Sequence, residues 1–181
     1  METNVLNVLE FNLTIPTEMQ FLPRLLKAAT CELQNPVLAD KVTIMAHFLC
    51  ELTLMEYEFI QYTPSTIALS AVCLALSAMG LDPWDQTLEH YSGHTYSESA
   101  FRICITRLYA LYVRPPVPQV RAVRGKYESA NFHSVACLVP APMPAFPVQQ
   151  AQHRGLQMSR EQQQRLLRQR QERERADAKT E

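Results

Sequence analysis

The sequence predicts an all-α protein, a five-helix bundle around one central apolar helix, and three observations support that fold class. Apolar residues recur at helical spacing through most of the chain, whereas the alternating pattern of strands is scarce. The sequence contains only 4 glycines. The residues from Ile67 to Met79 include no charged side chain. A helix that is apolar on every side is normally surrounded by other helices.

The central helix is expected to span Thr63 to Met79, because both of its ends carry helix signals. Thr63 suits the N-cap, Pro64 suits the first helical position and Gly80 suits the position just past the end. The apolar run is shorter than the roughly 20 residues that a membrane-spanning helix needs. The sequence therefore predicts a buried helix, with the four other helices packed around it.

Two helices are predicted before the central one. Thr17 and Gln20 form a capping-box pattern at the start of the first, and Pro23 is expected to bend that helix or to make its start irregular. The second lies within NPVLADKVTIMAHFLCELTLMEYEF and is apolar on two sides, so it is predicted to be mostly buried. Met1 to Asn12 is amphipathic and is expected to be the end of a helix or a linker.

Two further helices follow the central one. Asp82-Pro83 predicts the start of a short helix. The last helix follows Gly93 and ends before a cluster of prolines; its apolar stripe is Phe101, Cys104, Ile105, Leu108 and Tyr112. From Lys126 onward we expect a short irregular, extended arm with some apolar anchors.

The composition gives no global sign of a nucleic-acid or membrane partner. The formal net charge is −1 and 47% of the residues are hydrophobic, which is ordinary for a globular protein. The charge is uneven, since residues 1–139 carry 9 Lys and Arg against 13 Asp and Glu, about −4. The 5 cysteines are widely spaced in apolar stretches, which favours buried free thiols over disulfides. We expect a protein of the nucleus and cytoplasm.

The C-terminal region differs in composition from the rest of the chain. Residues 140–158 are rich in proline and are predicted to form a linker. Residues 159–181 are rich in Gln, Arg and Glu and are predicted to form a tail that is helical or disordered. The arginines of the tail could contact nucleic-acid phosphates, but acidic residues alternate with them and no aromatic side chain stands among them. A solvated segment is the favoured interpretation; the arginines are Arg165, Arg168, Arg170, Arg173 and Arg175.

The candidate chemical sites are weak. His90 and His94 stand four residues apart, as in a metal pair, but no further ligand follows at a suitable spacing. His133 and Cys137 have the same spacing, without a motif that would activate the thiol. Glu51 lies among apolar residues, which could raise its pKa; a carboxylate bonded to a helix N-terminus or an arginine is the favoured interpretation. We predict no catalytic residue, no cofactor and no metal site.

Several separate phrases resemble one family. VLNVLEFNLTIPTEMQFLPRLLKAA, HFLCELTLMEYEFIQYTPSTIALSAVCLAL, DPWDQTLEHYSG and VRGKYESANFHSVACL occur in the order found in the C-terminal half of mitotic cyclins. PWDQTLEHYSG is most similar to plant and algal A-type cyclins. The resemblance covers Glu2 to Pro142, nearly the whole predicted folded part.

The resemblance implies a second cyclin fold in residues 16–139, preceded by the end of a linker helix in residues 1–15. It also implies a regulatory subunit of a cyclin-dependent protein kinase in control of the cell division cycle, with no catalysis of its own. The first cyclin box of the family, which carries most of its kinase contacts, has no counterpart in this sequence. We therefore expect a fragment, a truncated product or an incomplete gene model, and we assign no partner-binding residue.

Two consequences of the missing box are expected. Binding to the kinase would be weak, and an apolar patch formed by Val5, Leu9 and Phe11 would be exposed.

Two other functions stay open. A cyclin-like adaptor could bind another protein or nucleic acid in transcription, although the acidic charge of residues 1–139 disfavours DNA. An enzyme is the least favoured reading.

Overall fold

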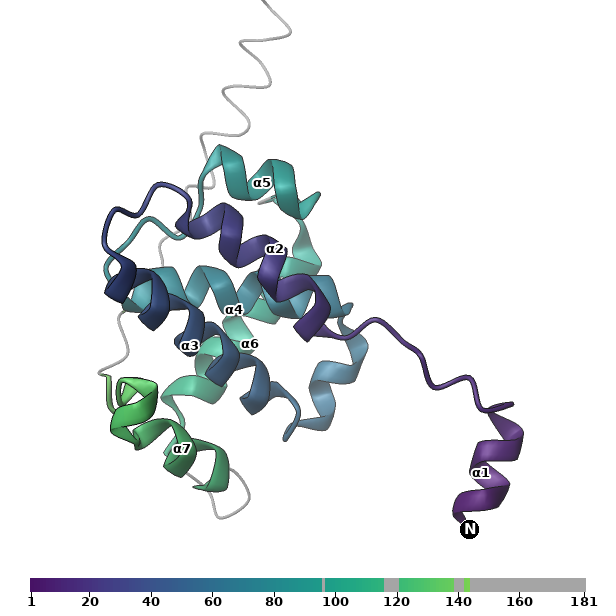
Figure 1. The fold of residues 1–181 in the computed structure, drawn as a ribbon. Coiled ribbons are helices and arrows are strands. Elements are labelled where there is room, and N and C mark those ends of the chain that lie inside the picture. Colours follow the sequence, from purple (N-terminus) through teal and green to yellow (C-terminus); the bar gives the residue numbers. More distant parts are fainter. Residues whose placement is uncertain (96, 116–120, 139–141, 144–181) are drawn as a thin grey trace, which may run out of the picture. The chain divides into compact units, whose positions relative to one another are not determined.

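The computed structural model describes residues 1–95, 97–115, 121–138 and 142–143, and all regular structure in them is helical (Figure 1). The predicted all-α class is therefore confirmed. None of the described helices is both long and apolar enough to cross a membrane. The proline-rich linker and the charged tail fall outside the described residues, apart from residues 142–143.

The elements are α1 (Glu2–Val8), α2 (Glu18–Thr30), α3 (Pro36–Thr53), the 3-10 helix η1 (Tyr57–Gln61), α4 (Pro64–Ala78), α5 (Gln86–Ser92), α6 (Ser99–Val113), α7 (Arg121–Glu128) and the 3-10 helices η2 (Ala130–Phe132) and η3 (Val135–Cys137).

Helix α4 has the predicted ends. The Thr63 hydroxyl accepts a 3.4 Å hydrogen bond from the Thr66 N–H, and Pro64 is the first helical residue. Gly80 follows the C-cap with a φ of +72°, a left-handed conformation that glycine adopts without strain. Every residue from Thr66 to Leu76 is buried, so the expectation of a helix without a polar face is confirmed.

Three helices, not four, make most of the contacts with α4. Helices α2, α3 and α6 pack directly on it, whereas α5 packs mainly on α2 (Figure 1). The prediction that all four other helices surround the central one is therefore wrong for α5. Helix α5 buries only Leu88 among its residues.

Two predicted helix starts differ from the structure in detail. Thr17 is the N-cap of α2, but its side chain makes no capping hydrogen bond; the Gln20 N–H bonds to the Thr17 carbonyl instead, at 3.0 Å. Helix α5 begins after Asp85, whose carboxylate accepts a 2.6 Å bond from the Leu88 N–H. Asp82 instead accepts from the Trp84 N–H at 3.1 Å, forming a turn before the helix.

The expectation of an extended, irregular arm from Lys126 is wrong. Lys126 lies within α7, and the described residues after it form the two 3-10 helices η2 and η3. Tyr127 and Val135 are buried and anchor this region, which contacts α3. Apolar anchors were expected there; the helical backbone was not, because α7 is short and mostly polar, with Gly125 inside it.

Candidate functional site

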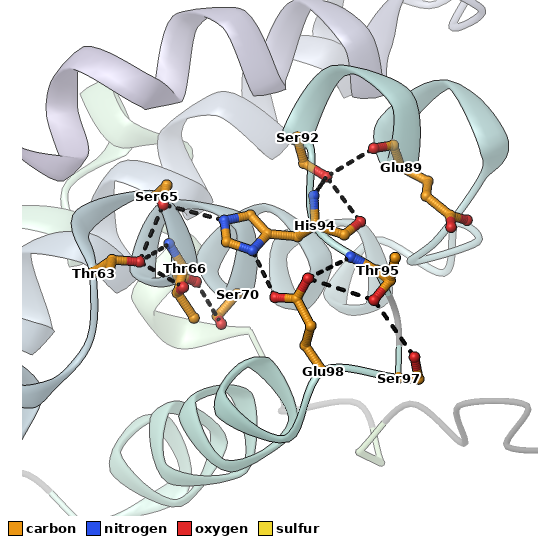
Figure 2. A network of polar contacts seen from close by, with 10 residues as sticks. All are labelled: Thr63, Ser65, Thr66, Ser70, Glu89, Ser92, His94, Thr95, Ser97 and Glu98. Atoms are coloured by element: carbon orange, nitrogen blue, oxygen red, sulfur yellow. Dashed lines mark hydrogen bonds and ion pairs between the residues drawn. The ribbon is translucent and has the colours of Figure 1, made fainter.

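A network of hydrogen bonds joins the start of α4 to the loop between α5 and α6 (Figure 2). The centre of this network is His94, whose Nδ1 lies 2.8 Å from Glu98 Oε2 and whose Nε2 lies 3.1 Å from Ser65 Oγ. Glu98 also accepts a bond from the Thr95 N–H at 2.9 Å. The bond between His94 and Ser65 joins two residues that lie 29 positions apart in the sequence.

The backbone positions His94 by a local turn. Gly93 ends α5 with a φ of +69°, and the His94 N–H then donates to Ser92 Oγ at 3.2 Å. The Thr95 N–H and the His94 ring hold the pKa of the Glu98 carboxyl below its ordinary value. Because the Glu98 carboxylate can only accept, His94 Nδ1 donates to it.

Ser65, His94 and Glu98 therefore stand in the order of a Ser–His–carboxylate triad. Sequence reasoning missed this constellation, since no spacing motif links Ser65 to the other two residues. The Ser65 hydroxyl also lies 3.1 Å from the Thr63 hydroxyl, and the hollow on α6 is lined by none of the three. The arrangement acts through its hydrogen bonds, which fasten the loop to α4.

The residues of the two pairs singled out in the sequence, His90 with His94 and His133 with Cys137, have separate surroundings. The His94 ring is occupied by Glu98 and Ser65, while the His90 ring lies against Tyr91, with ring centroids 5.3 Å apart. The His133 Nε2 lies 2.9 Å from Asp40 Oδ2, and Cys137 is exposed. In the described part of the chain, no three His, Cys, Asp or Glu side chains gather as a metal-binding group.

Glu51 joins α3 to α7. Its Oε1 accepts a 2.6 Å bond from Lys126 Nζ and a 2.7 Å bond from the Tyr127 hydroxyl. The favoured structural role agrees with this geometry, but the expected partners, a helix N-terminus or an arginine, are wrong. Tyr127 is buried against Phe48, with ring centroids 5.1 Å apart, and burial together with the bond to Glu51 raises the pKa of its hydroxyl.

Helix α7 is also fastened to α6. Arg124 Nη2 donates to the carbonyls of Tyr112 and Arg114, at 2.6 and 3.1 Å, and so satisfies backbone groups at the end of α6. We call Arg124, Lys126 and Tyr127 the C-terminal clasp. The clasp holds α7 against α3 and α6.

None of the five cysteines forms a disulfide, and three of them are buried. All five cysteines are free; Cys50, Cys73 and Cys104 are buried, and Cys31 and Cys137 are exposed. Burial raises the pKa of all three buried thiols, that of Cys104 to about 11. The prediction of buried free thiols is confirmed for Cys50, Cys73 and Cys104, which are poor nucleophiles at neutral pH, and is wrong for the exposed Cys31 and Cys137.

Two stretches expose large apolar side chains. The first is the N-terminal segment, residues 1–15, in which Val5, Leu9 and Phe11 are 51, 46 and 64% exposed. Helix α1 buries none of its residues. The second is the corner segment, Leu54–Gln61, between α3 and α4. Contiguous exposed apolar surface typically marks a place where another molecule binds, so both stretches are candidate interfaces.

Comparison with known proteins agrees with the fold. The family model "Cyclin, C-terminal domain" matches residues 16–141. The chain is 35% identical over 147 residues to G2/mitotic-specific cyclin-A of Hydra viridissima, covering 81% of this chain and 33% of the relative. It is 36% identical to G2/mitotic-specific cyclin-B3 of Gallus gallus (79% and 33%) and 38% identical to Cyclin-A2-1 of Oryza sativa subsp. japonica (76% and 28%).

A helical bundle with this match is a cyclin-fold domain. The chain belongs to the cyclin family, through the family's C-terminal domain. It spans about a third of the length of the curated relatives that it matches. The resemblance stated from the sequence is thereby confirmed at the level of the family.

Proposed function

We propose that this chain supplies the C-terminal domain of a cyclin-type regulatory subunit, which binds a cyclin-dependent protein kinase and helps to control the cell division cycle. The observation that carries the proposal is the match of residues 16–141 to the cyclin C-terminal domain, with relatives named G2/mitotic-specific cyclins. A subunit of this kind acts by binding one arrangement of the kinase better than another and so shifts its population. It needs no catalytic group of its own.

The structure supports a binding role in a second way. The His94 network and the C-terminal clasp connect separate helices of the bundle through hydrogen bonds. The N-terminal segment leaves Val5, Leu9 and Phe11 exposed. We propose that these side chains pack against a preceding cyclin box. A stable specific interface buries roughly 1,200–2,000 Å² in total. We propose that the first cyclin box supplies most of that area, so that the C-terminal domain alone binds the kinase weakly.

A kinase assay tests the proposal. The purified chain is added to a cyclin-dependent protein kinase, beside a fusion that places a first cyclin box from a related cyclin before Met1. We expect weak capture and no stimulation by the chain alone, and stimulation by the fusion. Strong stimulation by the chain alone would overturn the dependence on a first box. No capture of the kinase by either protein would overturn the kinase partner itself.

A cyclin-like adaptor in transcription is the second candidate. The acidic balance of residues 1–139 disfavours nucleic acid, so the adaptor would bind protein. A gel-shift titration with duplex DNA, compared with kinase capture under the same salt, separates the two functions. We also propose that the protein acts in the nucleus and cytoplasm, where fractionation of cells that express it should find it.

The absence of catalysis is itself part of the proposal. Ser65, His94 and Glu98 have the distances of a triad, so the chain should be tested for hydrolysis of a p-nitrophenyl ester and for labelling by a fluorophosphonate. We expect neither above the level of a Ser65→Ala variant. Labelling that Ser65→Ala abolishes would make the chain a hydrolase.

A further inference from the structure

We propose that the corner segment Leu54–Gln61 and the outward face of α6 together form a docking surface for an acidic peptide segment of another protein, in which apolar side chains flank a carboxylate. This surface is separate from the N-terminal segment and goes beyond the proposed function, because it does not depend on which kinase, if any, the chain binds.

The corner segment is unusually apolar for an exposed turn. Leu54, Met55, Tyr57 and Ile60 are 70, 45, 86 and 71% exposed, while Phe59 alone is buried and anchors the turn. Four large apolar side chains within seven residues are costly to leave in water and commonly mark a binding surface. They supply the apolar part of the proposed contact.

Two ion pairs connect the corner segment to α6. Glu58 Oε2 lies 2.6 Å from Arg107 Nη1, and Glu56 Oε1 lies 2.7 Å from Arg114 Nη1. These pairs neutralise the two acidic residues of the corner. They also hold its exposed apolar residues beside the outward face of the helix, so the two parts form one surface.

The outward face of α6 carries an open hollow of about 450 Å³ lined by Ser99, Arg102, Ile103, Thr106 and Arg107. Arg107 therefore belongs both to the hollow and to the ion pair with Glu58. The guanidinium of Arg102 makes no hydrogen bond or ion pair with any described residue, and its side chain is exposed. The hollow thus combines a positive charge that lacks a partner among the described residues, two hydroxyls and the half-exposed Ile103.

The charge of this face is opposite to that of the domain around it. Helix α6 contains Arg102 and Arg107 and no acidic residue, whereas residues 1–139 as a whole carry about −4. A carboxylate pairs with a guanidinium through two parallel hydrogen bonds, and the Ser99 hydroxyl can donate to it as well, whereas the Thr106 hydroxyl already donates to the Arg102 carbonyl at 2.7 Å. A basic peptide would meet Arg102 unfavourably, and two arginines are too few to hold a nucleic-acid backbone.

The test uses the full chain and a set of twelve-residue fluorescent peptides, each with one glutamate among leucine and phenylalanine, together with matched peptides in which lysine replaces the glutamate. Binding is measured by anisotropy, and the site is mapped by amide chemical shifts. We expect the glutamate peptides to bind at least about tenfold more tightly than the lysine peptides, with shifts confined to Leu54–Gln61 and Ser99–Arg107.

Variants locate the contact. Arg102→Glu should weaken binding by about tenfold or more, and Tyr57→Ser with Ile60→Ser should abolish it. Arg121→Glu, which reverses another exposed arginine, on α7, should leave binding unchanged. All four substituted residues are solvent-exposed, and circular dichroism checks that the variants fold.

Three results would overturn the proposal: no preference for glutamate over lysine, equal losses in Arg102→Glu and Arg121→Glu, or shifts located elsewhere. A phosphoserine peptide that binds more tightly than its glutamate counterpart would overturn the assignment of the carboxylate as the recognised group.

Discussion

Helix α4 and the N-terminal segment are both rich in apolar residues, yet one is buried throughout and the other is exposed. In α4 every residue from Thr66 to Leu76 is buried, while α1 buries none. The difference does not follow from apolar content. It follows from what packs on each stretch: α2, α3 and α6 cover α4, and no described element covers the apolar side chains of α1.

The comparison separates two uses of hydrophobic residues. In α4, burial removes apolar surface from water during folding and so stabilises the domain. In the N-terminal segment the same kind of surface stays available, so it can contribute to binding another molecule instead.

Ala71→Arg should unfold the domain. Ala71 is fully buried at the centre of α4, and an unpaired charge there costs several kcal/mol, a large part of a typical domain stability of about 5–15 kcal/mol. Circular dichroism melting measures the effect, with Val5→Arg in α1 as the matched control. An unchanged melting midpoint in Ala71→Arg would contradict the buried role of α4.

Glu51→Ala should destabilise the domain by about 1–3 kcal/mol, because it leaves the buried Tyr127 side chain without its 2.7 Å acceptor. The change tests whether the C-terminal clasp, and not only apolar packing, holds α7 on the bundle. Urea denaturation measures it, and Glu128→Ala, at an exposed position of α7, is the control. Equal stability of both variants would mean that the bonds of Glu51 to Lys126 and Tyr127 contribute nothing.

Glu98→Gln should remove a stabilisation that depends on pH. The pKa of Glu98 lies below its ordinary value of 4.5, so its contribution is fully present above about pH 4.5 and is lost as the pH falls through the lowered pKa. The difference in melting midpoint between the wild type and Glu98→Gln should therefore be constant from pH 7 to 5 and shrink below. Glu128→Gln controls for the lost charge; a gap that widens on acidification would refute the assignment.

Phe11→Ser should change the free energy of unfolding by less than about 0.5 kcal/mol, because Phe11 is exposed and surface changes usually have small effects. We also expect the exposed N-terminal segment to favour self-association of the chain at high concentration, and Phe11→Ser should reduce that self-association in sedimentation velocity. A loss of stability comparable to that of a buried phenylalanine, about 3–5 kcal/mol, would show that the N-terminal segment belongs to the core.

The central helix could be predicted from the sequence because its signals are local. Thr63, Pro64 and Gly80 mark its ends, and the uncharged run between them requires burial. The start of α5 was placed too early because Asp82 and Asp85 are both good caps, and only tertiary packing decides between them. The helical C-terminal region was missed because α7 is held by Glu51 and by the end of α6, contacts that lie 75 residues and 12 residues away in the chain.

The candidate site was less predictable still. The sequence singles out His94 only by its spacing from His90, whereas its partners in the structure are Ser65 and Glu98. No sequence motif encodes the separation between His94 and Ser65. The family was evident from several ordered phrases, which do not depend on knowing any contact. Sequence patterns thus identified the fold and the family, while the polar contacts that fix its loops required the structure.

Native-state hydrogen exchange on the chain alone tests the division between core and interface most directly. The backbone amides of α4 should exchange only through global unfolding, so their opening free energy should equal that measured by urea denaturation. The amides of Glu2–Val8 should exchange with little protection, because no described element packs over α1. Protection of the α1 amides equal to that of α4 would contradict the account and would make the N-terminal segment part of the folded core.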